Sequence, residues 1–421
     1  MGAKLSLSLP YKKHAEACSG GISHSEAAGR WPPPPCHVVN CITKYMDKDK
    51  IIIAQYGCGY WGPNLVRNFS SLPGCEVRYV VDSSLERRAF VEDSFPRTKP
   101  INDRQEALQD PEVDAIVIAT PAGMHYAQAK EALLAGKHIF VEKPLATSTE
   151  EVESLGKTAD ENGLVAMVGH TFVYNAAVRF VKEMIDQGEL GDLRYIYSQR
   201  LNLGRIRSDI DALWNFAPHD ISIIQYWLGD PEPISVHRVG MDFVQGGIDD
   251  VVFLNIIYPG KVLANIHVSW LDPQKVRKMI VVGSKKMVVY DDVSADGKIA
   301  IYDKGIDKKA ILGENMDFDQ PRANPFSYRS GDVLLPQVKF IEPLRKEAEH
   351  FLECIRTGNR PVTGIPHARQ VVSILERAKI SSPANLEMRE PLLAKPLVRK
   401  MASGNPMEDG LVEPIQAGVP L

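Results

Sequence analysis

Short apolar runs alternate with segments of helical spacing along residues 46–170. The apolar runs predict strands at 51–56, 77–81, 115–119, 139–141 and 165–168. Between and after them, apolar residues recur at helical spacing at 61–71, 84–94, 125–134 and 149–162. Alternating strands and helices of these lengths are typical of a doubly wound parallel sheet with helices on both faces. The pattern therefore predicts an α/β domain over residues 46–170.

The pattern changes after residue 170. Helices are predicted at 176–187 and from Pro218 to Gly229, with a strand at 193–201. Further strands are predicted at 234–244, 249–258, 261–270, 276–283 and 286–290, and helices at 342–356 and 366–379. Successive strands joined by tight turns favour antiparallel pairing. Residues 171–395 are therefore expected to form an α+β domain with a large, mostly antiparallel open sheet, through which we expect a homo-oligomer, either a dimer or a tetramer, to assemble.

Both ends of the chain lack this patterning. Residues 1–45 hold Cys18, Cys36 and Cys41 and a Trp31-Pro32-Pro33-Pro34-Pro35 run, without apolar periodicity. Such a segment cannot bury a core, so we expect a disordered non-core extension, with Met46 as the natural start. The first six residues also fit a myristoylation pattern, which remains an alternative. Residues 396–421 have little to bury and are expected to form a loose tail.

Composition narrows the class of protein. The chain has 421 residues, of which 44% are hydrophobic and 24% charged, enough for two domains. A net charge of −4 argues against a nucleic-acid partner. The sequence has no run of about eighteen apolar residues, so no membrane span is expected. The six cysteines have no metal-ligand spacing, and no secretory segment is recognisable, so we expect a cytoplasmic protein without a metal site.

The first predicted strand runs directly into Gly57-Cys58-Gly59-Tyr60-Trp61-Gly62. A G-x-G-x-x-G turn between a strand and a helix lets the backbone approach a pyrophosphate and is typical of dinucleotide sites. The second strand ends in Asp82, 20 residues after Gly62, where a carboxylate binds the ribose of NAD and repels the 2′-phosphate of NADP. NAD is therefore the expected cofactor and NADP the lesser one, although Arg87 and Arg88 could soften that preference or form a solvated helix face.

A second strand exit supplies candidate chemistry. The strand at 139–141 runs into Glu142-Lys143-Pro144, which puts a cation at the carboxyl end of a strand, where ligands of open α/β sheets bind. The roles of two histidines remain undecided between a structural and a functional one. His125 could begin its helix or contact the cofactor, and the role of His170, which follows the strand at 165–168 after Gly169, is equally undecided.

Taken together, these motifs resemble the glucose–fructose oxidoreductase, inositol dehydrogenase and rhizopine-catabolism (Gfo/Idh/MocA) family. The resemblance covers about residues 48–385, and beyond the glycine turn it rests on Thr120-Pro121 with His125, Glu142-Lys143-Pro144, and His219 ahead of Trp227-Leu228-Gly229. It implies an N-terminal Rossmann domain and an NAD(P)-dependent oxidoreductase acting on CH–OH groups. The run from Arg200 to Asp220 is similar to members that act on nucleotide-linked sugars.

The resemblance also implies roles for individual residues. Lys143 would polarise the reacting oxygen, and His219 would accept its proton as a neutral imidazole in the first turn of a helix beginning at Pro218. Many members carry an aspartate where this chain has Asn215, so His219 would lack a charged partner, while Asp220 would point elsewhere. The expected cofactor contacts are Gly57, Gly59, Tyr60, Trp61, Gly62, Asp82, Thr120, Pro121, His125, Glu142 and Lys143. The expected substrate contacts are Tyr174, Asn175, Arg200, Asn202 and Arg205.

The resulting prediction is an NAD-dependent oxidoreductase acting on a secondary hydroxyl of a nucleotide-linked hexose or hexuronic acid, with C3 as the candidate carbon, in sugar or polysaccharide metabolism. Two alternatives remain open: a dehydrogenase of inositol or a free sugar, and an NAD-binding sensor with impaired catalysis, for which Asn215 is the only support. The site residues also have structural interpretations. Lys143 would then be a surface lysine, His219 a helix cap, and the substrate contacts a solvated loop.

Overall fold

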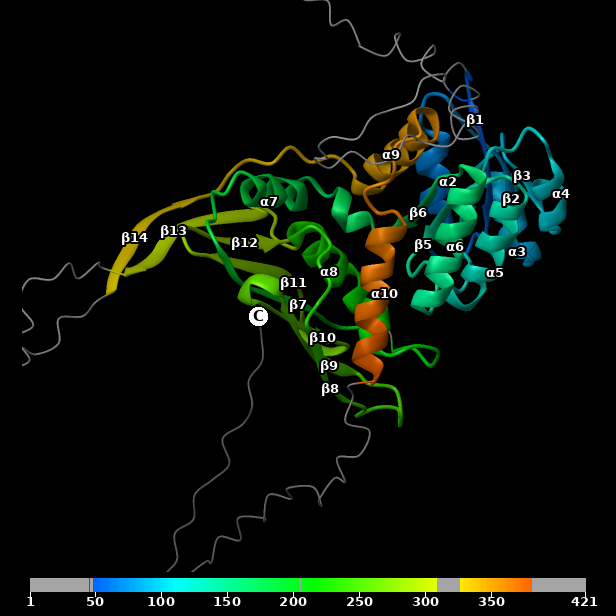
Figure 1. The fold of residues 1–421 in the computed structure, drawn as a ribbon. Helices are drawn as coiled ribbons and strands as arrows, with labels where there is room; N and C mark the ends of the chain where they lie inside the picture. The colour runs from blue at the N-terminus through cyan, green and yellow to red at the C-terminus, as the bar shows by residue number, and fades with distance from the viewer. Residues whose placement is uncertain (1–44, 46–47, 205, 309–325, 381–421) are drawn as a thin grey trace, which may run out of the picture. The chain divides into compact units, whose positions relative to one another are not determined.

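The computed structural model describes residues 45, 48–204, 206–308 and 326–380, shown as a coloured ribbon in Figure 1. Within them, the first half forms a six-stranded parallel sheet in the order β3-β2-β1-β4-β5-β6. The strands are β1 (Ile51–Tyr56), β2 (Cys75–Val81), β3 (Lys99–Ile101), β4 (Ala115–Ile118), β5 (His138–Glu142) and β6 (Ala166–Gly169). The strand order reverses beside β1, so the carboxyl ends of β1 and β4 flank the point at which such sheets bind ligands.

Helices cover both faces of this sheet. They are α2 (Gly62–Ser70), α3 (Leu85–Ser94), α4 (Arg104–Gln109), α5 (His125–Leu134) and α6 (Thr149–Asn162), with the 3-10 turn η1 (Ala122–Met124). β1 is buried along its length because Ile51 and Ile53 belong to one core and Ile52 and Ala54 to the other. This arrangement confirms the predicted doubly wound domain. The short elements β3 and α4 escape prediction because three and six residues give too little periodicity.

The second half forms an eight-stranded sheet in the order β14-β13-β12-β11-β7-β10-β9-β8, counted over the described residues. Neighbouring strands are antiparallel except β7 and β10. The strands are β7 (Leu193–Leu203), β8 (Ser235–Met241), β9 (Val251–Tyr258), β10 (Val262–Ser269), β11 (Leu271–Gly283), β12 (Met287–Asp291), β13 (Ile299–Lys308) and β14 (Phe326–Leu334). The mostly antiparallel sheet is therefore confirmed. β13 and β14 are not predicted, because Asp303 to Gly305 interrupts the apolar alternation of β13.

One face of this sheet packs against helices. They include α7 (Ala176–Asp186), α8 (Ala212–Leu228) and α10 (Ile365–Ile380), while α9 (Pro343–Thr357) packs against the first domain. The 3-10 turns η2 (Thr171–Tyr174) and η3 (Pro259–Lys261) complete the second half. The alternating burial of β9 separates the two faces, because Val252, Leu254 and Ile256 are buried whereas Phe253 and Ile257 are exposed.

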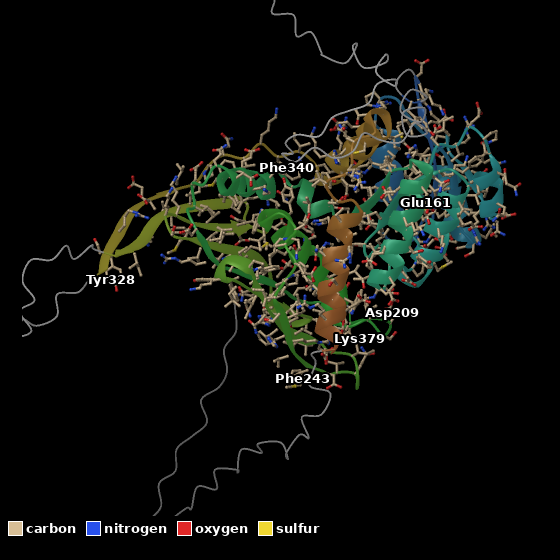
Figure 2. All side chains as sticks on the ribbon, in the orientation of Figure 1. Glu161, Asp209, Phe243, Tyr328, Phe340 and Lys379 are labelled. Carbon is tan, nitrogen blue, oxygen red and sulfur yellow. The ribbon has the colours of Figure 1, made fainter. Side chains whose placement is uncertain are left out.

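The opposite face of the sheet carries an apolar row. Ile257 of β9 lies opposite Leu263 of β10, and Leu263 lies opposite Tyr195 of β7. All three side chains are exposed. Figure 2 shows the side chains on the ribbon and labels three further exposed aromatic residues, Phe243 after β8, Tyr328 on β14 and Phe340 before α9. Solvated apolar rows of this kind are typical of surfaces that bind another protein.

The start of α8 differs from the prediction. The helix begins at Ala212, where the Asp211 carboxylate caps it by accepting from the Trp214 backbone N–H at 2.9 Å. Pro218, expected at the first helical position, lies inside the helix and only removes one interior donor. The predicted end at Gly229 is correct, and this glycine has φ of 80°. Because Asn215 is inside the helix, it shares a face with His219 four residues later.

The predicted end segments fall mostly outside the described residues. This applies to residues 1–44 and to the tail at 396–421. Tyr45 is an exception, since it is buried and its ring packs edge-on against His138 at a centroid distance of 5.0 Å. The expectation that residues 1–45 lie wholly outside the core is therefore wrong at Tyr45. In the part of the chain that the structure describes, no helix is long and apolar enough to cross a membrane.

Candidate active site

In the glycine turn between β1 and α2, two positions leave no space for a side chain and therefore require glycine. Gly57 has φ of 87°, and a Cβ there would lie 2.7 Å from the carbonyl oxygen of Ala119. A Cβ on Gly62 would lie 2.8 Å from the Gly57 carbonyl oxygen. At Gly59, by contrast, no described atom lies within 4 Å of the Cβ position. The turn is therefore closed on the protein side and open at Gly59, as required for a pyrophosphate to approach the backbone.

Asp82 lies beside this turn at the end of β2. One carboxylate oxygen accepts from the Cys58 backbone N–H at 2.7 Å, and the other accepts from the Ser84 backbone N–H at 2.9 Å. Arg88 folds back and donates to the carbonyl oxygen of Asp82 at 2.7 Å. Arg87 is exposed on α3. The carboxylate is thus held beside the glycine turn, and Arg88 is occupied by the backbone.

Two loops beside the turn are joined by His125. Its Nδ1 lies 2.7 Å from the Pro144 carbonyl oxygen and its Nε2 lies 2.8 Å from the Thr120 carbonyl oxygen. The ring is almost fully buried, which lowers its pKa. The Thr120 hydroxyl in turn donates to the Gln128 side-chain oxygen at 2.7 Å. His125 therefore fixes the Thr120-Pro121 loop against Pro144, and it is also the first residue of α5, which is one of the two roles expected for it.

Glu142 connects the strand exit of β5 to the glycine turn. Its carboxylate accepts from the Trp61 indole N–H at 2.7 Å, while the neighbouring Tyr60 side chain is exposed. Burial raises the pKa of Glu142, opposed by the charge of Lys143. The carboxylate also lies 3.2 Å from the Cβ position of Gly169 on β6. Glu142 therefore joins Trp61, in the turn expected to hold a dinucleotide, to the end of β6.

Lys143 reaches from the first domain to α8. Its Nζ donates to the backbone carbonyl oxygen of Asn215 at 3.2 Å. Burial lowers the pKa of Lys143, Glu142 opposes this effect, and Arg200 and Arg207 reinforce it. The ammonium group is therefore more acidic than an ordinary surface lysine, which suits a group that donates a hydrogen bond or a proton to a reacting oxygen.

His219 lies on the same helix as Asn215. Its Nδ1 is buried and has no hydrogen-bond partner among the described residues. Burial lowers the pKa of His219 well below its usual value, and the charges of Lys143 and Arg200 add to the effect. The predicted neutral imidazole agrees with this direction, but its predicted cause, the first turn of a helix, is wrong because α8 begins seven residues earlier at Ala212.

The residues expected to contact substrate have diverse surroundings. The Tyr174 hydroxyl bonds to Thr363 Oγ1 at 3.0 Å, and Asn175 caps α7 by accepting from the Ala177 backbone N–H. Arg200 is buried and donates through Nε to Asp220 at 2.6 Å. Tyr174 and Asn175 therefore have structural roles. Asn202 lies on β7 next to the loop that leads to α8, and Arg205 is outside the described residues.

A cationic group near His219 becomes visible only in the structure. The Phe172 ring packs edge-on against His219 at 5.1 Å and lies beneath the guanidinium groups of Arg200, at 4.6 Å, and Arg277, at 5.8 Å. Arg277 of β11 lies directly opposite Arg200 of β7 in the sheet register. The sequence could show that both residues are on strands but could not give the pairing that brings them together.

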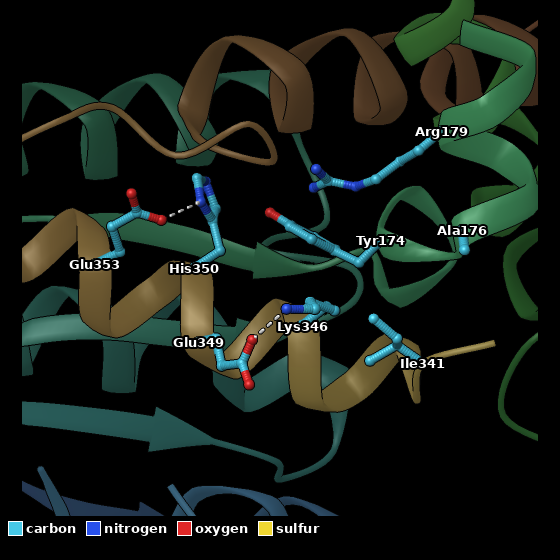
Figure 3. A pocket seen from close by; sticks show the side chains of 8 residues that line it. All are labelled: Tyr174, Ala176, Arg179, Ile341, Lys346, Glu349, His350 and Glu353. Atoms are coloured by element: carbon cyan, nitrogen blue, oxygen red, sulfur yellow. Dashed lines mark hydrogen bonds and ion pairs between the residues drawn. The ribbon is translucent and has the colours of Figure 1, made fainter. Parts of the chain in front are cut away.

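A separate surface pocket of about 340 Å³ lies away from these groups and is shown in Figure 3. Lys346 bonds to Glu349 at 2.8 Å, His350 lies 3.8 Å from Glu353, and the Arg179 guanidinium lies 4.9 Å from the centre of the Tyr174 ring. The lining residues are Tyr174, Ala176, Arg179, Ile341, Lys346, Glu349, His350 and Glu353. Neither Lys143 nor His219 is among them. We therefore locate the candidate active site at the carboxyl ends of β1, β4 and β5, beside α8.

Comparison with known proteins gives two family matches. A model described as the oxidoreductase family with an NAD-binding Rossmann fold matches residues 51–170, and a model of the GFO/IDH/MocA C-terminal domain matches residues 178–289. The chain is 34% identical over 185 residues to 4-carboxy-2-hydroxymuconate-6-semialdehyde dehydrogenase of Sphingobium sp., an alignment that covers 42% of this chain and 59% of that protein.

Two further comparisons concern one activity. The chain is 33% identical over 169 residues to UDP-N-acetylglucosamine 3-dehydrogenase of Acidithiobacillus ferrooxidans, covering 40% of this chain and 52% of that protein. The solved structure of UDP-N-acetylglucosamine 3-dehydrogenase GnnA from the same organism superposes with a TM-score of 0.65 at 23% identity, covering 79% of this chain and 98% of that one. The sequence alignments thus span little more than half of the Sphingobium and Acidithiobacillus dehydrogenases. The structural superposition extends the shared fold to nearly all of the Acidithiobacillus enzyme.

Proposed function

This chain belongs to the GFO/IDH/MocA oxidoreductase family, and on that premise we propose that it transfers hydride between a secondary sugar hydroxyl and NAD. One observation carries the proposal. Lys143 contacts α8 one helical turn before His219, so a cation and a neutral imidazole converge at the carboxyl end of β5. Alcohol oxidation requires such a pair, because a proton must leave the oxygen while hydride leaves the carbon.

Lys143 and His219 have different roles in this oxidation. Lys143 donates a hydrogen bond to the reacting oxygen and stabilises its developing negative charge. His219 accepts the hydroxyl proton, which it can do because burial and nearby cations keep the ring neutral. The bound nicotinamide supplies the hydride acceptor. Asn215 presents an amide instead of a carboxylate on the same helical face, so the imidazolium formed on His219 gains no ion pair from that position.

The proposed cofactor is NAD, held by the open backbone at Gly59 and by Asp82. The Asp82 carboxylate would accept hydrogen bonds from the ribose and would repel a 2′-phosphate. Of the two neighbouring cations that could bind such a phosphate, Arg88 donates instead to the backbone oxygens of Asp82 and Ser83, and Arg87 is exposed on α3. The fit therefore favours NAD over NADP.

The proposed substrate is anionic, a nucleotide-linked hexose or hexuronic acid oxidised at C3. Arg200, Arg207 and Arg277 all act electrostatically on Lys143 or His219. Asp220 neutralises much of the charge of Arg200, whereas Arg277 is more exposed and lies 3.5 Å from Asp292. A phosphate or carboxylate could therefore bind to Arg277 and Arg207 without displacing a buried ion pair. The likeness to a UDP-N-acetylglucosamine 3-dehydrogenase supports a nucleotide-linked sugar.

We also propose that two copies associate through the open face of the eight-stranded sheet. The support is the exposed apolar row formed by Tyr195, Ile257 and Leu263 on adjacent strands. Replacing Leu263 with Lys should convert the assembly to monomers in analytical ultracentrifugation. An unchanged sedimentation coefficient for a multimeric parent would contradict this surface assignment.

The substrate proposal is tested by adding nucleotide sugars, hexuronic acids, free sugars and inositols to purified protein with NAD or NADP and following nicotinamide absorbance. Turnover of a nucleotide sugar with NAD supports the proposal. Selective turnover of inositol or a free sugar would favour a polyol dehydrogenase. Cofactor binding without turnover across the panel would instead favour a sensor, which the amide at Asn215 makes a specific second candidate.

A further inference from the structure

Three histidines, two of them buried and one partly buried, lie between the active site and the far end of α8. They are His219, His170 and His367, and each has one ring nitrogen without a hydrogen-bond partner among the described residues: Nδ1 of His219, Nδ1 of His170 and Nε2 of His367. A buried polar group that has no hydrogen-bond partner lowers the stability of a protein. Three such nitrogens in neighbouring rings therefore require an explanation.

His170 lies at the same sheet edge as the proposed catalytic lysine. It directly follows β6, whose last residue, Gly169, pairs with Glu142 of β5. Its pKa is lowered by burial and by the charges of His367 and Lys143, and His170 itself contributes to the lowered pKa of His219. The ring therefore lies within electrostatic range of both proposed catalytic groups and stays neutral.

His367 and Asp230 continue from His170 toward solvent. The rings of His170 and His367 contact edge-on with centroids 5.3 Å apart. His367 lies in the first turn of α10, and its Nδ1 is 2.7 Å from a carboxylate oxygen of Asp230. Asp230 directly follows Gly229 at the end of α8, and 32% of its side chain is exposed. The row thus starts at a buried imidazole and ends at a partly solvated carboxylate.

We propose that His170, His367 and Asp230 form a relay that conducts the proton of the oxidised hydroxyl from His219 to solvent. The inference rests on the proposed oxidoreductase function. As hydride leaves the carbon, the O–H bond breaks and an N–H bond forms on His219. His219 passes a proton to His170, and His170 passes one to Nε2 of His367, in each case through a bridging water, because these nitrogens are not hydrogen-bonded to one another. His367 releases its Nδ1 proton to Asp230, and water removes it, so each ring ends with one proton.

The other carboxyl groups near the site are less suitable exits for this proton. Asp220 is buried and bonded to Ser198 and Arg200. Glu347 is fully buried, its pKa is raised well above the usual value by burial, and it accepts from the Thr171 hydroxyl at 2.8 Å. A carboxylate that neutralises an arginine, or a carboxyl group kept protonated by burial, is a poor acceptor for this proton. Asp230 is the partly exposed carboxylate at the end of the histidine row.

A purely structural role would explain only part of this arrangement. The bond between His367 and Asp230 ties α10 to the end of α8, and that role uses Nδ1 alone. It leaves Nε2 of His367 and Nδ1 of His170 unpaired and therefore unexplained. A relay uses both, because an imidazole that conducts a proton accepts it on one nitrogen and releases it from the other.

The test separates hydride transfer from proton release. His367→Asn retains an N–H donor near the Nδ1 position, so the bond to Asp230 is kept, but it removes the nitrogen that would receive the proton. Parent and variant are mixed with NAD and the substrate found in the panel, in weak buffer with a pH-indicator dye. Nicotinamide absorbance reports hydride transfer and the dye reports proton release. His350→Gln serves as a matched control, because His350 is a histidine of α9 that lies outside the row. His350 accepts a hydrogen bond from the Val362 backbone N–H, and the side-chain oxygen of glutamine can accept the same bond.

In the parent and in His350→Gln, proton release should keep pace with reduction of NAD. In His367→Asn, proton release should lag and kcat should fall about tenfold or more, with KM nearly unchanged and the melting temperature retained. Asp230→Asn should produce the same lag. Proton release that keeps pace in both variants would overturn the relay, as would a lowered melting temperature without a lag. An active parent with such variants would leave the proposed function intact, whereas a parent inactive on the whole panel would overturn both.

Discussion

Asn215→Asp would place a carboxylate next to His219, and its effect can be estimated from the geometry of α8. Residues four apart on a helix have Cβ atoms about 6 Å apart. At an effective dielectric constant of about 20, two unit charges at that distance interact by about 3 kcal/mol, or about two pKa units. Lys143 already contacts the backbone of Asn215 and would share the new carboxylate. We therefore expect the pKa of His219 to rise by about one to two units.

The direction of the effect on rate follows from the role of His219. The parent ring is held neutral by burial and nearby cations, so its pKa lies well below the usual value. A base acts in its neutral form, so a raised pKa moves the acidic limb of the kcat/KM profile to higher pH. Activity near neutral pH and above should persist. The variant should thus lose rate on acidification at a higher pH than the parent does.

The assay is the pH dependence of kcat/KM with saturating NAD, with Asn215→Leu as the control that removes the amide without adding charge. The acidic limb of the kcat/KM profile should move to higher pH in Asn215→Asp and remain in place in Asn215→Leu. An unmoved limb in Asn215→Asp, or the same shift in both variants, would refute the assignment of His219 as the base beside residue 215. Turnover that appears only in Asn215→Asp would favour the sensor interpretation of the parent.

Three further outcomes follow from the structure. Asp82→Ser should weaken NAD binding and strengthen NADP binding, both measured by calorimetry, because the variant loses a hydrogen-bond acceptor for the ribose and a charge that repels the 2′-phosphate. An unchanged cofactor preference would assign the ribose contact to another residue. Gly57→Ala should cost at least about 1–2 kcal/mol of unfolding free energy and abolish tight NAD binding, since its Cβ would meet the Ala119 carbonyl oxygen, and parent-like stability in urea would contradict the turn geometry. Tyr45→Ala should cost about 3 kcal/mol in the same assay, and a loss below about 0.5 kcal/mol would show that Tyr45 does not stabilise the core.

The features that sequence predicts well are those encoded locally. The glycine turn, Asp82 and the Lys143 strand exit follow from residues adjacent in sequence, and the parallel sheet brings their ends to one edge regardless of loop details. Proline misled the assignment of α8, because Pro218 is compatible with both a first helical turn and a helix interior that tolerates one missing donor. The capping residue, Asp211, was the better signal.

The features that sequence does not predict depend on register and packing between distant segments. Arg277 meets Arg200 only because β11 pairs with β7 in one register. Arg200 was expected to bind substrate, yet its guanidinium group donates to the carboxylate of Asp220 on α8. No local sequence pattern predicts that ion pair. The contact of His367 with His170 likewise joins α10 to the end of β6 across about two hundred residues of chain.

The most direct test of the central claim is single-turnover reduction of NAD by the parent and by Lys143→Met. If Lys143 polarises the reacting oxygen, the variant should reduce NAD about 10² to 10⁴ times more slowly, while calorimetry should show that NAD still binds. A variant that retains a rate within a few-fold of the parent would contradict the account, because the cation at the carboxyl end of β5 would then have no part in hydride transfer.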